Sequence, residues 1–191
     1  GSLRDAVSSS NRLVGFEVGG VIEGGFSVSD NVTIAGQTAP YPGITVIKGT
    51  IQTEGSDIVA SHITLHMGDG YGADAWNVDG NNIVLDHVAV YWGTDETLPV
   101  DYSSNVTLYK CIIAEGLQFT GHSDGEHSKG LHIKDGFDTL SVLGCLGAHN
   151  ALRNPRIDGG AAFLGNYVVY NWGTGWDHQG PKVSSDEGLT L

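Results

Sequence analysis

The sequence is poor in basic residues, cysteine and proline, and it contains no long hydrophobic run. Its 191 residues include 9 Lys and Arg against 22 Asp and Glu, which gives a net charge of −13. This balance argues against nucleic acid or an anionic membrane surface as a partner. No apolar run approaches the roughly 18 residues of a membrane-spanning helix. The opening GSLRDAVSSS is polar and lacks a signal-peptide segment, which suits a mature or trimmed form.

The small number of cysteines leaves little room for disulfides. Cys111 and Cys145 are two free buried thiols or, as the less favoured alternative, one disulfide. Glycine is abundant, with 29 residues and no collagen-like period, which suits many tight corners between short strands. The length predicts a single domain, residues 1–191, with a sizeable core.

A segment that repeats about every 23 to 25 residues dominates the sequence, and a period of this size is typical of stacked-coil folds. In each unit the apolar residues alternate as they do in strands. The units are Asp57–Gly68, Asn82–Gly93, Asn105–Gly116, Thr139–Asn150 and Ala162–Gly173.

Superposition of the units predicts an inward ladder of side chains. Its members are Ile63, Val88, Cys111, Cys145 and Val168. Successive coils of such a stack lie about 4.8 Å apart. The repeat therefore predicts an all-β parallel β-helix.

Charge is distributed unevenly along the repeat. No Lys or Arg occurs between Gly49 and Tyr109, a stretch with nine carboxylates, whereas four of the nine basic residues lie between positions 129 and 156. Crowded carboxylates are costly unless a cation holds them. Oxygen ligands at irregular spacing suit Ca²⁺ better than Zn²⁺. A solvated acidic face is an equally open alternative.

The best metal candidates are four acidic residues, in the loops on either side of one repeat unit. They are Asp74, Asp95, Glu96 and Asp101. Asp86 and His87 lie inside that unit, where a hydrogen-bonded structural role is favoured over a ligand role. The histidine pairs His62/His66 and His122/His127 lack the cysteine or glutamate company of a zinc motif.

Two arginines follow one strand unit in the segment LRNPRIDGG. Pro155 fixes the backbone locally, so Arg153 and Arg156 project from a defined loop. Guanidinium groups grip carboxylates in a bidentate manner. Lys129 is the third cation that we expect near this region. Salt bridges with acids such as Asp158 are the alternative role for these arginines.

Four segments together resemble the pectate lyases of polysaccharide lyase family 1. They are NVTIAGQTAP, NIVLDHVAV, HSKGL and GAHNALRNPRIDGG. The resemblance implies a right-handed, single-stranded parallel β-helix that cleaves polygalacturonate by β-elimination with Ca²⁺. It also implies a secreted, monomeric protein whose partner is an acidic polysaccharide.

The resemblance also assigns roles to residues. Asp74 matches a calcium-binding Asp, and Glu96 and Asp101 approximate two further ligands, with Asp95 as a rival. Lys129 matches a substrate-binding lysine, and Arg153 matches the arginine that removes the C5 proton. The sequence departs from the family pattern in two ways. Asp158 stands where the family often has a second Arg, and Arg156 is the expected substitute for substrate binding. An N-terminal cap and some C-terminal coils are expected to be absent.

Two other functions stay open at this point. One is a non-catalytic uronan-binding β-helix or inactive lyase fragment, in which Arg153 and Lys129 bind without elimination. The other is a purely structural β-helix whose charges solvate the surface.

Overall fold

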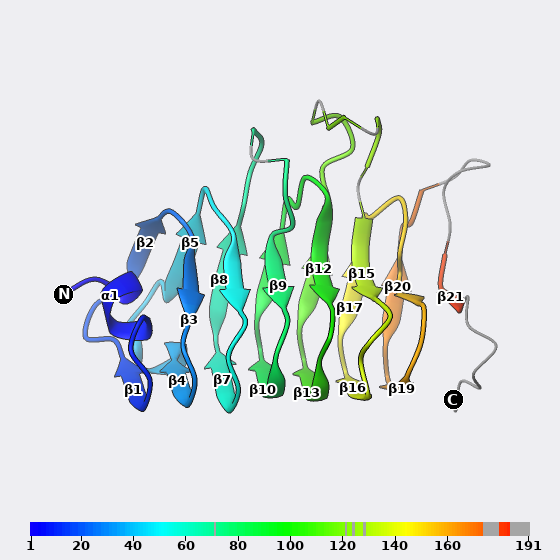
Figure 1. Ribbon diagram of the computed structural model, residues 1–191. Coiled ribbons are helices and arrows are strands. Elements are labelled where there is room, and N and C mark those ends of the chain that lie inside the picture. Colours follow the sequence, from blue (N-terminus) through cyan, green and yellow to red (C-terminus); the bar gives the residue numbers. More distant parts are fainter. Residues whose placement is uncertain (71, 121, 124, 128, 174–179, 184–191) are drawn as a thin grey trace.

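The chain winds into a parallel β-solenoid with three short strands in each full coil (Figure 1). The computed structural model describes residues 1–70, 72–120, 122–123, 125–127, 129–173 and 180–183. Every strand pairing in these residues is parallel, and strands with the same role in successive coils lie side by side. The predicted all-β parallel β-helix is confirmed.

Three seven-stranded sheets run along the stack. The first contains β1 (Arg12–Gly15), β4 (Val32–Ala35), β7 (Ile58–Ser61), β10 (Asn81–Asp86), β13 (Ser104–Tyr109), β16 (Thr139–Leu143) and β19 (Ala161–Gly165). The second contains β2 (Gly20–Glu23), β5 (Ile44–Ile47), β8 (Ile63–His66), β11 (Ala89–Tyr91), β14 (Ile112–Ala114), β17 (Leu146–Ala148) and β20 (Val168–Tyr170). The third contains β3 (Phe26–Val28), β6 (Ile51–Thr53), β9 (Trp76–Val78), β12 (Glu96–Val100), β15 (Lys129–Ile133), β18 (Arg156–Ile157) and β21 (Lys182–Val183).

Alternating side chains build the core between the three sheets. In the first sheet Ile83 pairs with Ile58 on one side and Val106 on the other, and all three are buried. The next inward row contains Leu85 and Leu108, which are fully buried. Because each coil repeats the inward positions of the one before, the apolar rows run unbroken along the stack.

The predicted inward ladder is present with one correction at its end. Ile63, Val88, Cys111 and Cys145 are each about 1% exposed, and both cysteines are free thiols. Val168 instead pairs with Leu146 and is 57% exposed, so the next ladder position is Tyr167. The prediction was wrong there because the Trp-Gly pair at 172–173 is shifted by one residue from the pair at 92–93.

A short helix, α1 (Leu3–Val7), packs over the first coil (Figure 1). Leu3 and Val7 are buried in the hydrophobic core, and the Ser2 side chain caps the helix by accepting a hydrogen bond from the Asp5 backbone. A 3-10 turn, η1 (Gly36–Thr38), follows β4. No helix in the described parts of the chain is long and apolar enough to cross a membrane.

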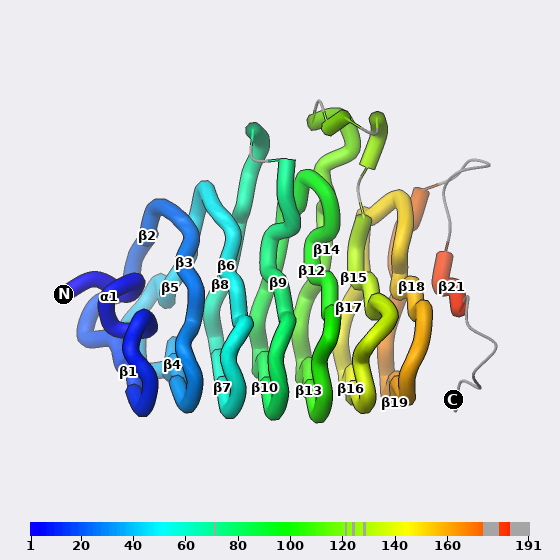
Figure 2. The backbone as a smooth tube through the Cα atoms, viewed as in Figure 1, coloured from blue at the N-terminus to red at the C-terminus, as the bar shows by residue number. Residues whose placement is uncertain are grey.

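The coils differ most in the connections between the second and third sheets. These connections follow β8, β11, β14 and β17, and those after β8 and β14 rise above the stack on the same side (Figure 2). The chain then enters the third sheet, so residues at the start of β9, β12, β15 and β18 are close neighbours. This is where most of the predicted site residues lie.

Candidate active site

The candidate site lies at the N-terminal ends of four consecutive third-sheet strands. Glu96, the first residue of β12, pairs in register with Lys129, the first residue of β15. Lys129 in turn forms a bridge with Leu152 in the next coil. The stacking therefore gathers six of the predicted residues: Asp74 before β9, Asp95 and Glu96 at β12, Lys129 at β15, and Arg153 and Arg156 at β18.

Three carboxylates form the acidic part of the site. One ligand atom from each of Asp74, Asp95 and Glu96 lies within 4.8 Å of the others. The Glu96 backbone N–H donates to Asp74 Oδ1 at 2.8 Å, which fixes the Asp74 side chain relative to the next coil. Glu96 itself is buried, with 4% exposure.

The electrostatic environment differs sharply between two of these carboxylates. Burial raises the pKa of Asp74 to about 6, an effect that the nearby cations oppose and Asp95 increases. Burial would also raise the pKa of Asp95, but the hydrogen bond and charge of Lys129 outweigh it and hold that pKa low. Asp74 is thus easier to protonate than Asp95, and a bound cation would favour its ionised form.

Two cations contact the acidic group directly. Lys129 Nζ lies 2.5 Å from Asp95 Oδ1 and 4.0 Å from Glu96 Oε1. Arg153 Nη1 forms an ion pair with the same Glu96 oxygen. Glu96 therefore links Asp74, through its backbone, to Arg153, through its carboxylate, so the residues predicted for metal and for catalysis share one site.

His132 lies at the centre of the basic part, and the sequence interpretation did not identify it. Its Nδ1 is 2.8 Å from Arg153 Nη1, and its Nε2 is 2.6 Å from Asp158 Oδ2. An Nε2–H that donates to Asp158 leaves Nδ1 free to accept a hydrogen bond from Arg153. Burial lowers the pKa of His132, although Asp158 opposes this shift, which favours the neutral ring.

Arg153 is strained and partly desolvated. Its backbone has a φ of +58°, in the left-handed region that non-glycine residues seldom adopt. Burial lowers the pKa of its guanidinium, and the neighbouring charge of Arg156 lowers it further, against the opposing effect of nearby acids. These properties are common among residues at functional sites.

Arg156 and Asp101 lie at the margin of the site. Arg156 Nε donates to Asp158 Oδ1 at 2.8 Å, so Asp158 holds this arginine. Asp101 follows β12 and pairs with Lys134 at 3.7 Å. The structure does not bring Asp101 into the group of Asp74, Asp95 and Glu96, but Asp74 and Asp101 line the same small cavity.

Two histidines complete the surroundings of Asp95. His127 Nε2 lies 3.1 Å from Asp95 Oδ1, and His122 Nε2 lies 3.8 Å from Asp95 Oδ2. The two rings are in contact, with centroids 3.9 Å apart. Asp95 therefore faces Lys129 and both histidines, which explains why it stays ionised more readily than Asp74.

The donor set suits calcium. Asp74, Asp95 and Glu96 offer carboxylate oxygens, the ligands that Ca²⁺ prefers in proteins. Burial raises the pKa of Asp74 to about 6, and a bound cation would favour its ionised form. The residues present therefore fit a hard divalent cation.

Comparison with known proteins gives relatives of a single kind. No protein-family model matches the chain. The chain is 46% identical over 182 residues to the "Probable pectate lyase C" of Aspergillus flavus, which is 92% of this chain and 41% of the relative. The protein of that name from Aspergillus fumigatus is 44% identical over the same shares. That from Aspergillus terreus is 42% identical over 193 residues, 97% of this chain and 44% of the relative.

The chain thus spans less than half the length of the curated relatives that it matches. The similarity covers almost all of this chain, including the coils that carry the acidic group and both arginines. The expected resemblance is confirmed: over nearly its whole length, the chain is similar to the pectate lyases.

Proposed function

We propose that this chain carries the catalytic centre of a Ca²⁺-dependent pectate lyase that cleaves α-1,4-linked polygalacturonate by β-elimination. The observation that carries the proposal is the convergence of Arg153 and Lys129 with three carboxylates at one end of the third sheet. The proposal also includes a secreted, monomeric protein with an acidic polysaccharide as partner, and no nucleic-acid or membrane partner.

In this reaction Arg153 removes the proton from C5 of a galacturonate residue. The electron pair of the C5–H bond forms the C4–C5 double bond, and the C4–O4 bond breaks. The departing oxygen takes up a proton from solvent and becomes part of a new reducing end, while Arg153 returns its proton to solvent. No water is added across the bond, which separates this reaction from hydrolysis.

Arg153 must carry a neutral guanidine to act as a base, whereas a guanidinium group in water normally keeps its proton up to about pH 12 or higher. Burial and the charge of Arg156 both lower its pKa, which raises the neutral fraction. His132 accepts from Nη1 of Arg153 and donates to Asp158, so this chain of hydrogen bonds fixes the guanidine plane. Such positioning supports proton transfer in a set direction.

Lys129 and Arg156 are the proposed substrate-binding cations. Neutralisation of the galacturonate carboxylate makes its neighbouring C5–H more acidic and stabilises the developing enolate. Lys129 lies beside Asp95, and Arg156, on the next coil, is more exposed and reaches toward solvent. Asp74, Asp95 and Glu96 would hold the Ca²⁺ ion, with Asp101 as a further proposed ligand at the edge. When bound, the ion supplies positive charge to the substrate carboxylate.

The test is incubation of the chain with polygalacturonate and Ca²⁺, with ultraviolet absorbance of the unsaturated product as the readout. We expect product formation that stops with a chelator. Arg153→Ala should lower kcat by about 10²- to 10⁴-fold, the usual contribution of general acid–base catalysis. Lys48→Ala is the matched control, because Lys48 is exposed, pairs with Glu23, and follows β5 in the coil before those that carry the site.

The outcomes separate the functions that the sequence left open. Binding of polygalacturonate without unsaturated product would replace the lyase by a non-catalytic uronan-binding protein. Neither binding nor product would leave a structural β-helix. Equal turnover of Arg153→Ala and Lys48→Ala would remove Arg153 from the role of base.

A further inference from the structure

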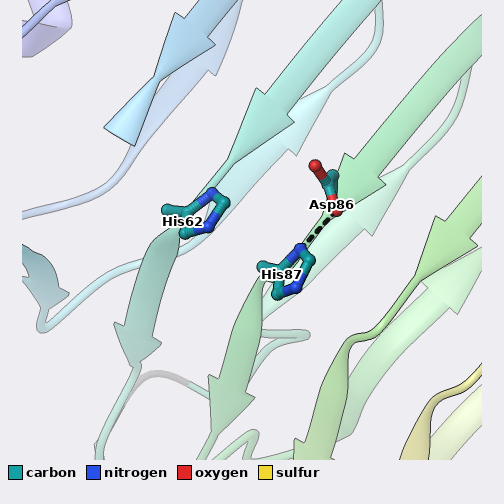
Figure 3. Close-up of side chains that lie close together, drawn as sticks. All are labelled: His62, Asp86 and His87. Carbon is teal, nitrogen blue, oxygen red and sulfur yellow. Dashed lines mark hydrogen bonds and ion pairs between the residues drawn. The ribbon is translucent and has the colours of Figure 1, made fainter. Parts of the chain in front are cut away.

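A second cluster of metal-binding side chains lies away from the candidate active site. It is formed by His62, Asp86 and His87 at the corner between the first and second sheets (Figure 3). His62 joins β7 to β8, and His87 joins β10 to β11 in the next coil. The active-site residues lie instead where the chain enters the third sheet, so the two groups are built on different corners of the coils.

The backbone at this corner places the two histidines side by side. Ser61 pairs with Asp86, so His62 and His87 occupy equivalent positions of adjacent coils. Both residues have a left-handed backbone, with φ of +55° and +52°. Their rings stack with centroids 4.7 Å apart and an angle of 13° between the planes.

Asp86 orients one ring. Its Oδ1 lies 2.5 Å from Nδ1 of His87, so in the neutral imidazole an Nδ1–H that donates to the carboxylate leaves the Nε2 lone pair for a metal. A carboxylate behind a histidine is the arrangement that orients metal-binding imidazoles and raises their basicity. One potential ligand atom from each of the three residues lies within 4.8 Å of the others, and the side chains of His87 and Asp86 are 39% and 33% exposed. An ion from solvent can therefore reach the cluster.

The neighbouring coils limit the site to two imidazoles. The equivalent corner before His62 is Gly36, and the one after His87 is Lys110. Tyr109 packs its ring edge-on against His87, with centroids 5.9 Å apart, and Lys110 lies over the Tyr109 ring. The Tyr109 ring thus lies in contact with both His87 and the ammonium group of Lys110 in the next coil.

We propose that His62 and His87 bind a borderline transition-metal ion such as Zn²⁺ or Ni²⁺, with Asp86 as the residue that orients His87. Imidazole nitrogens suit these ions, whereas Ca²⁺ prefers oxygen ligands such as the carboxylates of the active site. On binding, the two rings turn out of their stacked arrangement so that a nitrogen of each points at the ion, and water fills the remaining coordination positions. The ion ties two adjacent coils together at one corner, and it stabilises the folded state because the unfolded chain does not hold the two rings side by side.

The test is titration of the full chain with ZnCl₂ or NiCl₂ in saturating Ca²⁺, after removal of trace metals. Calorimetry counts the bound ions, and thermal unfolding reports stabilisation. The variants are His62→Asn, His87→Asn and the double variant. The fold tolerates asparagine here, because the equivalent corner of the last described coil is Asn166, with a φ of +52°. His149→Asn is the control, since His149 is an exposed histidine with the same left-handed backbone outside the cluster.

We expect the wild type and His149→Asn to bind one more ion than the double variant and to unfold at a higher temperature with the metal than without it. Asp86→Asn should weaken the affinity by about 10- to 100-fold, the usual effect of removing the partner behind a metal-binding histidine. Equal stoichiometry and affinity in the wild type and the double variant would overturn the proposal, because the ion would then lie elsewhere, for example at Asp95, His122 and His127. A wild type that binds no such ion would overturn it as well.

Discussion

The Asp74→Asn substitution tests the electrostatics of the acidic group without a substrate. Asparagine keeps the Oδ1 atom that accepts from the Glu96 backbone at 2.8 Å, and it removes the titratable charge by placing an amide NH2 where the second carboxylate oxygen was. Burial raises the pKa of Asp74 from 3.8 to about 6. A difference of about 2 pKa units corresponds to about 3 kcal/mol between the charged and the neutral form.

The sign of the pH dependence follows from the raised pKa. In the absence of Ca²⁺ the folded chain keeps a proton on Asp74 that the unfolded chain releases, so the free energy of unfolding falls as pH rises from 3.8 to about 6. The Asp74→Asn variant has no carboxyl group at this position, so its free energy of unfolding does not fall for this reason. We therefore expect Asp74→Asn to match the wild type near pH 4 and to exceed its stability by about 3 kcal/mol near pH 8.

Urea unfolding in a chelator at both pH values measures this difference. Asp138→Asn, at an exposed position, is the control and should show no comparable growth with pH. Added Ca²⁺ should stabilise the wild type at the higher pH and the Asp74→Asn variant much less. A wild-type to Asp74→Asn difference that is the same at both pH values would refute the reasoning, because Asp74 would then carry no uncompensated charge.

Three further substitutions test other parts of the site and the fold. Lys129→Ala should lower kcat by about 10²- to 10³-fold with an unchanged circular dichroism spectrum, and a collapsed spectrum would contradict a catalytic surface role. Asp158→Ala should lower kcat, because His132 then loses its acceptor and holds Arg153 less firmly, and it should also change KM, because Arg156 loses its partner; unchanged kcat would exclude this support. Leu108→Ala should cost about 2–5 kcal/mol in urea unfolding, since Leu108 is fully buried; a loss below 1 kcal/mol would show that the coils rearrange to fill the space.

The sequence predicted the fold because a stacked coil repeats its inward positions. Ile63, Val88, Cys111 and Cys145 are one coil apart in the sequence and in contact in the structure. The one error, Val168, came from aligning a Trp-Gly pair whose spacing differs in that coil. Such a shift reverses the direction of every side chain in a strand, so it matters more than its size suggests.

The candidate site was predictable where residues lie at the entrance to the third sheet, and less so within its strands. Asp74, Glu96 and Arg153 met as expected, since all three lie where the chain enters the third sheet. His132 escaped notice because it lies inside β15, where the sequence resembles an ordinary strand, and only the exact register of the coils brings it to Arg153 and Asp158. The stacking of His62 on His87, rather than on His66, has the same cause.

The most direct test of the central claim is the mass of the reaction products. Elimination by Arg153 splits a galacturonate oligomer into two fragments whose masses add up to that of the substrate, with one fragment unsaturated at its new non-reducing end. We predict this result for the chain in Ca²⁺, with no such fragments from Arg153→Ala. Fragments whose masses add up to the substrate plus one water would show hydrolysis, and they would contradict the proposed reaction.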